Sequence, residues 1–488
     1  MQLTDLPEAR ADVAPGAPCL RDDAGHLTNA AFARRVASAA AHLAERGIEE
    51  GDVVAVKLSN RVELIVVLFA AWRLGAVVTP VNPSLGPVET AYQVGDAGAA
   101  LLVAESGAAD LAPEAAASVA SVDEIARDEA DAAAAPPRAR TRPEDLALLI
   151  YTSGTTGSPK GVMLTHANVA AMTASFIEWL GLGPRDHSLL VLPLFHANGI
   201  VLGTLSVLRA GGQVTITGRF SRERFFADVE RHRPTYFSAV PAIYALLSAL
   251  PADVKPDTSS LRFAVCGAAP MPAELIHRFE ERFGVTIVEG YGLSETTTAS
   301  TINPLDGVRK PGTVGLPLPG QRVAVVDEAG EPVPPGEIGE VVIAGPVVMA
   351  GYLGRPEATA ETIVDGWLHT GDIGRFDEDG YLLIVDRLKD MIIRGGENVY
   401  PKEIENALYL HDAVLEAAVV GRPDDVLGEV PLAFVTLRPD GEATAAELLA
   451  LCRRELAAYK RPVGVRFLDE IPKNPVGKID KRRLRALA

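Results

Sequence analysis

One stretch of this chain decides the expected fold: Leu146-Ala-Leu-Leu-Ile-Tyr-Thr-Ser-Gly-Thr-Thr-Gly-Ser-Pro-Lys-Gly161. It begins as an apolar run that is typical of a buried strand and continues as a loop rich in Gly, Ser and Thr. Thr165 then stands where it can cap a helix that begins near His166. Glycines let backbone N–H groups turn toward an anion, and hydroxyl groups add further donors. The stretch therefore predicts a strand and a loop that binds a polyphosphate.

This loop does not fit the Walker pattern of the P-loop NTPases. That pattern needs Gly-Lys-Ser/Thr, whereas here Pro159 precedes Lys160 and Gly161 follows it. The loop therefore indicates a different class of phosphate-binding protein.

Outward from the loop, short apolar runs alternate with amphipathic segments. Strands are expected at 146–151, 188–192, 214–217, 236–239, 263–266 and 286–289, and helices at 30–46, 62–74, 222–232 and 272–283. This alternation predicts an α/β fold with a largely parallel sheet. An earlier strand is expected at 53–58, and the Ala/Asp/Glu/Pro-rich segment 104–145 is expected to form surface helices and a flexible approach.

The pattern of expected strands and helices changes twice after this region. Residues 312–386 read as Gly/Pro-punctuated strands, such as 322–326 and 339–344, and the last hundred residues alternate helix and strand around a smaller core. We expect a large N-terminal α/β domain with mostly parallel sheets plus a β-rich subdomain over 1–386, and a small α+β C-terminal domain over 387–488.

Composition narrows the function class. The 488 residues carry 46 Lys plus Arg against 64 Asp plus Glu, a formal charge of -18, which argues against a broad electrostatic grip on nucleic acid or anionic lipid. Three distant cysteines support neither a disulfide framework nor a Cys-rich metal site. The N-terminus shows no secretory signal, and the longest apolar run, 64–72, is too short to span a bilayer. A cytoplasmic protein is expected.

Seven further motifs accompany the loop. In chain order they are Leu192-Pro-Leu-Phe-His-Ala-Asn-Gly199, Cys266-Gly-Ala-Ala-Pro270, Glu289-Gly-Tyr-Gly-Leu-Ser-Glu-Thr296, Gly366-Trp-Leu-His-Thr-Gly-Asp372, Asp386-Arg-Leu-Lys-Asp390, Arg394-Gly-Gly-Glu-Asn-Val-Tyr-Pro401 and Pro472-Lys-Asn-Pro-Val-Gly-Lys478. In identity, order and spacing the set resembles the adenylate-forming superfamily of acyl- and aryl-CoA synthetases, stand-alone adenylation domains and firefly-type luciferases. The resemblance runs from residue 151 almost to the C-terminus.

The resemblance implies a two-step reaction with ATP, Mg²⁺ and coenzyme A. A carboxylate attacks the α-phosphorus of ATP to give acyl-AMP and pyrophosphate, and a thiol then displaces AMP. Both reactants of the first step are anionic, so cations must neutralise their repulsion. Glu295 is implied as a Mg²⁺ ligand together with Thr155. The cradle for the β- and γ-phosphates is implied to include Thr152, Ser153, Gly154, Thr155, Thr156, Gly157 and Lys160.

The remaining nucleotide contacts follow from the same resemblance. Asp372 is implied to accept hydrogen bonds from both ribose hydroxyls, with Arg387 beside it, and Tyr291 to stack on adenine. The rest of the implied nucleotide set consists of Gly267, Ala268, Ala269, Gly292 and Ser294. Ser294 stands where many members carry Thr, and either residue offers a hydroxyl.

The C-terminal motifs imply a mobile domain. Lys478 is implied to contact the substrate carboxylate and the α-phosphate during adenylation, and Lys389 to be the pivot about which this domain rotates. Lys478 must leave before a thiol can occupy the same space. After rotation Gly395, Gly396 and Glu397 are implied to face the site, with the glycines leaving room for a pantetheine arm.

The class of acid substrate is inferred from positions at which family members with different substrates carry different residues. Amino-acid-activating members place Asp where His196 stands, and malonate-activating members place Arg where Gly290 stands. Burying a dianion without that Arg is costly, so a monocarboxylate is expected: fatty, alicyclic, aryl or arylacrylic. The expected acyl pocket comprises His196, Ala197, Asn198, Ser238, Val240, Gly290 and Leu293, and His196 is also a catalytic candidate.

Several alternatives stay open at this point. The acceptor is free CoA or a carrier protein, because both present the same pantetheine thiol. A malonyl-CoA-synthetase-like dicarboxylate ligase is a further alternative. A non-catalytic binding protein with a degenerate site is another, but it is disfavoured because Glu295, Asp372, Arg387 and Lys478 are all present. The spacing Pro472-x₄-Gly477-Lys478 additionally suggests a lysine acetyltransferase as a partner acting on Lys478.

Overall fold

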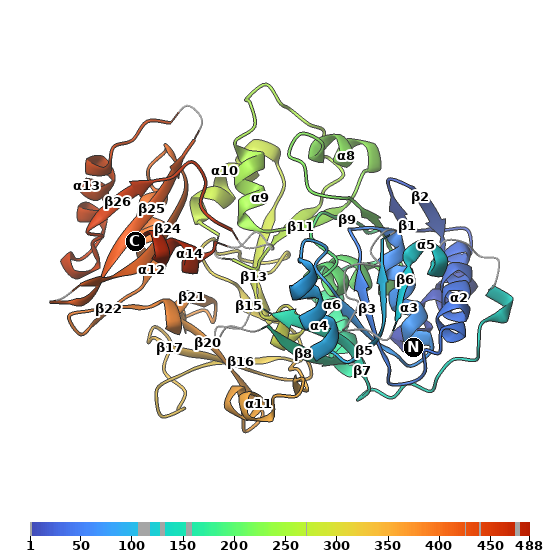
Figure 1. Ribbon diagram of the computed structural model, residues 1–488. Coiled ribbons are helices and arrows are strands. Elements are labelled where there is room, and N and C mark those ends of the chain that lie inside the picture. The colour runs from blue at the N-terminus through green and yellow to red at the C-terminus, as the bar shows by residue number, and fades with distance from the viewer. Residues whose placement is uncertain are drawn as a thin grey trace.

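The computed structural model (Figure 1) describes residues 2–105, 118–126, 132–152, 159–269, 271–424, 426–438, 441–473 and 479–488. Its first sheet has nine strands in the order β15-β14-β13-β12-β11-β9-β10-β1-β2. The strands from β13 to β1 are parallel, and β2, β14 and β15 pair antiparallel at the ends. The strands are β1 Pro18–Asp22, β2 Gly25–Thr28, β9 His187–Leu190, β10 Gln213–Ile216, β11 Tyr236–Ala239, β12 Phe263–Cys266, β13 Ile287–Tyr291, β14 Thr301–Ile302 and β15 Leu316–Pro317.

A second sheet has seven strands in the order β18-β8-β7-β4-β3-β5-β6, parallel from β7 to β6. Its strands are β3 Val53–Lys57, β4 Val77–Pro80, β5 Ala99–Ala104, β6 Ser118–Ser121, β7 Leu146–Thr152, β8 Lys160–Thr165 and β18 Gly351–Tyr352. Strand β6 lies in the segment for which surface helices were expected. Its weakly apolar sequence, Ser-Val-Ala-Ser, carries little strand signal, so pairing with β5 decides its conformation.

The largest apolar core joins both sheets through helices. Helix α3 (Val62–Arg73) is buried on every side from Val62 to Trp72, and helix α6 (His166–Leu180) contributes Val169, Met172 and Phe176 to the same core. The predicted N-cap of α6 is confirmed: the Asn168 N–H donates to Thr165 Oγ1 (3.1 Å), and the Thr165 N–H donates to Asn168 Oδ1 (2.8 Å). Apolar side chains on all faces are expected for a helix between two sheets.

Most of the other predicted elements are confirmed with shifted ends. The expected strands at 236–239, 263–266, 322–326 and 339–344 coincide with observed strands, whereas the helix expected at 222–232 begins later, as α8 Phe225–His232. Two further helices matter for the site, α9 (Pro241–Ser248) and α10 (Ala273–Phe283). The sequence analysis did not anticipate the π-helix Asn198–Ser206, or that residues 18–28 join the sheet formed after residue 186.

A third, antiparallel sheet forms the β-rich part: β16 Arg322–Val326, β17 Gly339–Ala344, β19 Ile363–Val364, β20 Trp367–Phe376 and β21 Leu382–Arg387. After the short helix η6 (Leu388–Asp390), a fourth sheet builds the separate C-terminal domain from β22 Ile392–Arg394, β23 Glu397–Val399, β24 Val414–Asp424, β25 Gly428–Leu437 and β26 Gly464–Phe467. Its helices are α12 Pro401–Tyr409, α13 Ala445–Glu455 and α14 Lys481–Leu487. This domain lies at one end of the molecule, beside α9 and α10 (Figure 1).

The predicted α/β architecture with a separate C-terminal domain is therefore confirmed. No helix within the described ranges is both long and apolar enough to cross a lipid bilayer.

Candidate active site

Four neighbouring parallel strands of the nine-stranded sheet end beside the predicted motifs. Strands β9, β11, β12 and β13 are followed by the motif that begins at Leu192, by Val240, by Gly267 and by the run Gly292–Thr296. Carboxyl ends of parallel strands meet at one edge of a sheet, where open α/β folds bind their ligands. The sheet therefore gathers segments that are far apart in the sequence into a single candidate site.

The best-defined cluster surrounds Asp372, which is only 2% exposed. Tyr291 at the end of β13 donates its hydroxyl to Asp372 Oδ2 (2.6 Å), and Arg387 Nε lies 2.8 Å from Asp372 Oδ1. Asp372 and Arg387 are directly paired across β20 and β21, which explains their contact. Burial, reinforced by the Asp372 carboxylate, holds the pKa of Tyr291 well above its usual value, so the phenol keeps its proton.

A second cluster surrounds Glu295 in the short helix Ser294–Thr296. The Tyr352 hydroxyl donates to Glu295 Oε1 (2.9 Å), and Lys160 Nζ lies 4.8 Å from the centre of the Tyr352 ring. Burial and the adjacent carboxylate raise the pKa of Tyr352. The sequence analysis missed Tyr352, because one Tyr in a Gly-rich stretch carries no chemical signal of its own. Pairing of β18 with β8 brings it to the site.

The backbone around these two clusters is tightly constrained. A Cβ at Gly292 would lie 2.0 Å from the Thr298 carbonyl oxygen, and Thr297 has φ +61°. On the adjacent strand end, Ala268 has φ +69°, a conformation that is unusual for a residue with a Cβ. Local strain of this kind persists where the surrounding structure over-determines the backbone, and it is concentrated at functional sites.

The hairpin of β7 and β8, which flanks the predicted phosphate loop, is held by hydrogen bonds near both ends of that loop. Thr152 and Lys160 face each other across β7 and β8. Tyr151 donates its hydroxyl to Asp96 Oδ2 (2.8 Å), and Tyr92 donates its hydroxyl to the Pro159 carbonyl oxygen (3.0 Å). Both bracing groups come from helix α4 (Pro87–Asp96). The predicted loop residues Ser153, Gly154, Thr155, Thr156 and Gly157 lie outside the described residues, as do Pro270 and Lys478.

Most of the expected acyl-pocket residues come from the ends of β9 and β11. Asn198 begins the π-helix, and its Oδ1 accepts a 3.4 Å hydrogen bond from the Ser238 hydroxyl, so the two polar residues satisfy each other. Ala197 is buried, and the His196 ring lies 4.4 Å from the Phe195 ring. Val240 precedes α9, whereas Leu293 packs against the apolar core of the β-rich sheet.

Gly290 is constrained by packing. A Cβ at this position would lie 2.8 Å from Ile302 Cγ1 and 2.9 Å from the Thr301 carbonyl oxygen, both in the paired strand β14. A larger residue here therefore requires β14 to move.

The buried carboxyl group of Glu289 also interacts electrostatically with a lysine of the C-terminal domain. Glu289 in β13 is 3% exposed, and burial raises its carboxyl pKa to about 7, an effect that the charge of Lys402 opposes. Lys402 belongs to α12 of the C-terminal domain, where its Nζ donates to the Ile384 carbonyl oxygen (2.8 Å) and its N–H donates to Asp386 Oδ2 (3.0 Å). Nothing in the sequence indicated this electrostatic interaction, because a Glu and a Lys 113 positions apart show no pattern.

The remaining predicted residues lie near the junction between the two domains. Lys389 is in η6, and burial lowers its pKa, with the Arg387 charge acting in the same direction. The next residue, Asp390, forms an ion pair with Arg485 of α14 (2.6 Å). Gly395 and Gly396 form the turn between β22 and β23 with φ +60° and +87°, a conformation that glycine adopts without strain.

Comparison with known proteins identifies the family. The model of the AMP-binding enzyme family matches residues 7–353, and that of the AMP-binding enzyme C-terminal domain matches residues 403–478. Feruloyl-CoA synthase of an Amycolatopsis species is 40% identical over 490 residues, covering 99% of this chain and 98% of the relative. The 2-succinylbenzoate–CoA ligase of Geobacillus kaustophilus is 36% identical and covers 99% and 98%.

Solved structures of two ligases superpose on this chain over its full length. An anthranilate CoA ligase in complex with anthranoyl-AMP superposes with a TM-score of 0.93 at 28% identity, covering 100% of this chain and 97% of that chain. ATP-bound MatB from Rhodopseudomonas palustris superposes with a TM-score of 0.92 at 33% identity, covering 100% and 99%. The chain therefore belongs to the AMP-binding enzyme family and is an AMP-forming acid–thiol ligase.

Proposed function

We propose that this ligase activates a monocarboxylic acid with an uncharged tail, aryl or arylacrylic in the first instance, as acyl-AMP and transfers it to CoA. The observation that carries the nucleotide half of the proposal is the buried Asp372 carboxylate, held by Tyr291 and Arg387. A carboxylate fixed by two donors is positioned before its ligand arrives, which lowers the entropy cost of binding. Its remaining lone pairs are assigned to the two ribose hydroxyls.

Glu295 and Lys160 supply the charges for the phosphate half of the site. Tyr352 occupies only Oε1 of Glu295 among the described contacts, which leaves carboxylate oxygen for a cation. Mg²⁺ is usually held by one or two carboxylates together with substrate phosphates and water. Glu295 and Thr155 are therefore assigned to Mg²⁺, which would neutralise the nucleotide phosphates.

The assignment of the acid rests on two independent supports. Position 290 carries no cationic side chain, and its packing against β14 leaves no room for one without a backbone shift. The relative with 40% identity is named for feruloyl-CoA, the thioester of an arylacrylic acid. Buried apolar residues such as Ala197 and Ala239 are compatible with an aromatic tail.

The names of some other relatives indicate substrates with two acid groups. A sulfoacetate–CoA ligase of Cupriavidus necator is 38% identical, and an oxalate–CoA ligase of Arabidopsis thaliana is 36% identical. Both named substrates carry a second acid group. These acids, together with 2-succinylbenzoate and malonate, belong in any test of the proposal.

The decisive experiment is an acid panel scored by pyrophosphate release and then by thioester formation with CoA. Ferulate, cinnamate, benzoate and a medium-chain fatty acid form one arm, and the four diacids form the other. We expect the highest kcat/KM for an acid of the first arm. A diacid that exceeds every mono-acid would contradict the proposed substrate class.

The same assay identifies the acceptor. Free CoA is proposed because the relatives are named as CoA ligases. Transfer to a holo-carrier protein at a higher rate than to CoA would show that a carrier is the acceptor.

A further inference from the structure

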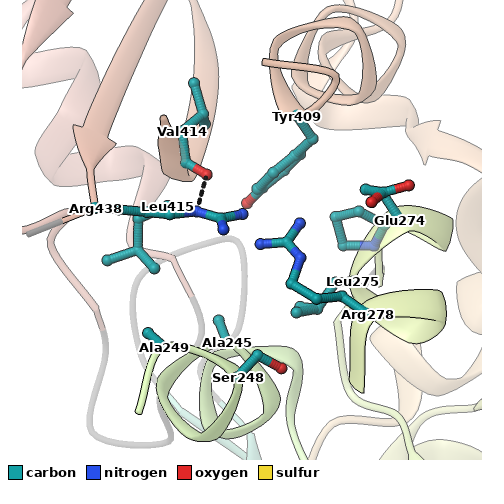
Figure 2. Close-up of a pocket in the computed structure, with 11 residues that line it drawn as sticks. Ala245, Ser248, Ala249, Glu274, Leu275, Arg278, Tyr409, Val414, Leu415 and Arg438 are labelled. Carbon is teal, nitrogen blue, oxygen red and sulfur yellow. Dashed lines mark hydrogen bonds between the residues drawn. The ribbon is translucent and has the colours of Figure 1, made fainter. Parts of the chain in front are cut away.

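A pocket lies between the two domains, away from the residues assigned to the nucleotide (Figure 2). The N-terminal domain contributes α9 and α10, through residues such as Ala245, Leu275 and Arg278. The C-terminal domain contributes Tyr409 of α12 and Arg438 at the end of β25. Leu415 of β24 packs against the apolar core that contains α9 and α10, so the wall of the pocket is a genuine interdomain contact.

Two guanidinium groups from different domains face each other in this pocket. Figure 2 shows the Arg278 side chain directed toward Arg438 and the tip of Tyr409. Arg438 donates through Nε to the Val414 carbonyl oxygen (3.4 Å). Within the described ranges no carboxylate oxygen lies within 4.0 Å of either guanidinium, including that of Glu274 on the same helix as Arg278. Pro439 and Asp440 lie outside those ranges.

Like charges that converge across an interface repel one another unless an anion lies between them. Guanidinium groups present several N–H donors in a planar fork that matches the oxygens of a phosphate. Tyr409 adds a hydroxyl that keeps its proton, because burial raises its pKa. The cavity volume is about 20 Å³, which is enough for one water-sized group such as a single oxygen of an anion.

We infer that the pocket binds a small free phosphate-type anion between Arg278 and Arg438, with Tyr409 as a third donor. Because one arginine comes from each domain, the complete site exists only in the domain arrangement seen here. An anion that binds one arrangement preferentially must stabilise it, in proportion to its differential affinity. Bound phosphate therefore stabilises the contact between the C-terminal domain and α10.

Binding is tested by calorimetry with inorganic phosphate on the full-length protein, with ionic strength held constant by NaCl. Arg278→Gln and Arg438→Gln should each weaken phosphate binding by about tenfold or more, since each removes a charge-assisted pair of hydrogen bonds. The matched controls are Arg231→Gln and Arg453→Gln, which remove one exposed charge from each domain. These controls should bind phosphate as the wild type does.

A further variant separates this pocket from the nucleotide site. Lys160→Ala should leave the Arg278-dependent binding unchanged. Loss of binding in Lys160→Ala but not in the two arginine variants would place the phosphate at the nucleotide loop and overturn the inference. Tighter binding of 3′,5′-ADP than of phosphate through the same two arginines would overturn the assignment to a small free anion.

Stabilisation of the domain arrangement by phosphate is tested by trypsin cleavage near Lys389, between the domains. Phosphate should slow this cleavage in the wild type. Arg278→Glu should slow cleavage without phosphate and abolish the phosphate effect, because the introduced carboxylate would pair directly with Arg438 across the interface. Equal phosphate protection in Arg278→Glu and in the wild type would show that phosphate does not act here. The test uses no ligase activity, so its failure and that of the proposed function are distinguishable.

Discussion

Asp372 shows at the residue scale how this site is prepared for its ligand. Both of its oxygens already accept bonds, from Tyr291 and Arg387. Asp372→Asn keeps the shape but replaces one acceptor oxygen with a donor and removes the charge. Bonds to a charged group contribute about 1.5–3 kcal/mol, so KM for ATP should rise roughly 10- to 100-fold in ATP–pyrophosphate exchange. Tyr291→Phe keeps the ring, and should therefore show a smaller rise than Asp372→Asn.

Gly290 offers a residue-scale test of packing. Gly290→Ala places a Cβ against Ile302 and the Thr301 carbonyl, and overpacking of this kind costs about 1–3 kcal/mol. We expect a lower Tm by thermal denaturation. Gly183→Ala is the matched control, because its Cβ would meet nothing within 4 Å. Equal Tm values for the two variants would mean that β14 yields without cost.

We expect Glu289 to contribute to the pH dependence of stability. Its pKa is raised from 4.5 to about 7 by burial, so the folded state binds this proton more tightly than the unfolded state. The resulting stabilisation is complete below about pH 4.5 and is lost as the pH rises toward 7, with a slope of at most about 1.4 kcal/mol per pH unit. Glu289→Gln lacks this titration. Its Tm should therefore rise relative to that of the wild type between about pH 5 and pH 8, and a constant difference would contradict the prediction.

At the scale of elements, helix α4 braces the phosphate-loop hairpin. Tyr151 bonds to Asp96, which also pairs with Arg355 (2.9 Å), and the Tyr151 ring lies 3.1 Å from where a Cβ of Gly161 would stand. Asp96→Asn weakens the brace at a distance from the loop itself. We expect kcat/KM for ATP to fall about tenfold while kcat/KM for CoA with preformed acyl-AMP stays within about twofold.

Tyr92→Phe removes the other end of the same brace, at the Pro159 carbonyl oxygen, and should act in the same direction. Glu357→Gln alters an exposed carboxylate near the start of α11 (Pro356–Thr362) and serves as the control. An equal fall in both half-reactions for Asp96→Asn would indicate a general loss of structure.

At the scale of the whole molecule, the two domains are joined through η6, by polar contacts such as those of Lys402, and by the packing of Leu415. Lys389→Pro fixes φ near -65° in this connection and removes an N–H. If the C-terminal domain must rotate between half-reactions, single-turnover formation of acyl-AMP should survive, whereas transfer from preformed acyl-AMP to CoA should fall by at least about tenfold. Lys478→Ala is the complementary variant, with adenylation lost and transfer retained. Equal losses in both half-reactions for Lys389→Pro would exclude a hinge at this residue.

Local sequence by itself determined many of the helices and strands and the positions of the motifs along the chain. Alternating apolar runs predicted strands at 236–239 and 263–266, and Thr165 predicted the start of α6, because caps and periodicity depend on neighbouring residues. The order of motifs predicted an adenylate-forming enzyme, which the family match to residues 7–353 confirms. The family resemblance also predicted Arg387 beside Asp372, and the structure shows the two side chains in contact.

Only the tertiary structure decided the contacts between distant segments. Tyr352 reaches Glu295 because β18 pairs with β8, and β6 is a strand because β5 offers it a free edge. Arg278 shares a pocket with residues of a second domain, and no local pattern encodes the orientation of that domain. The physical reason is the same in each case: burial and charge depend on which surfaces pack together, and packing is a property of the whole chain rather than of any window along it.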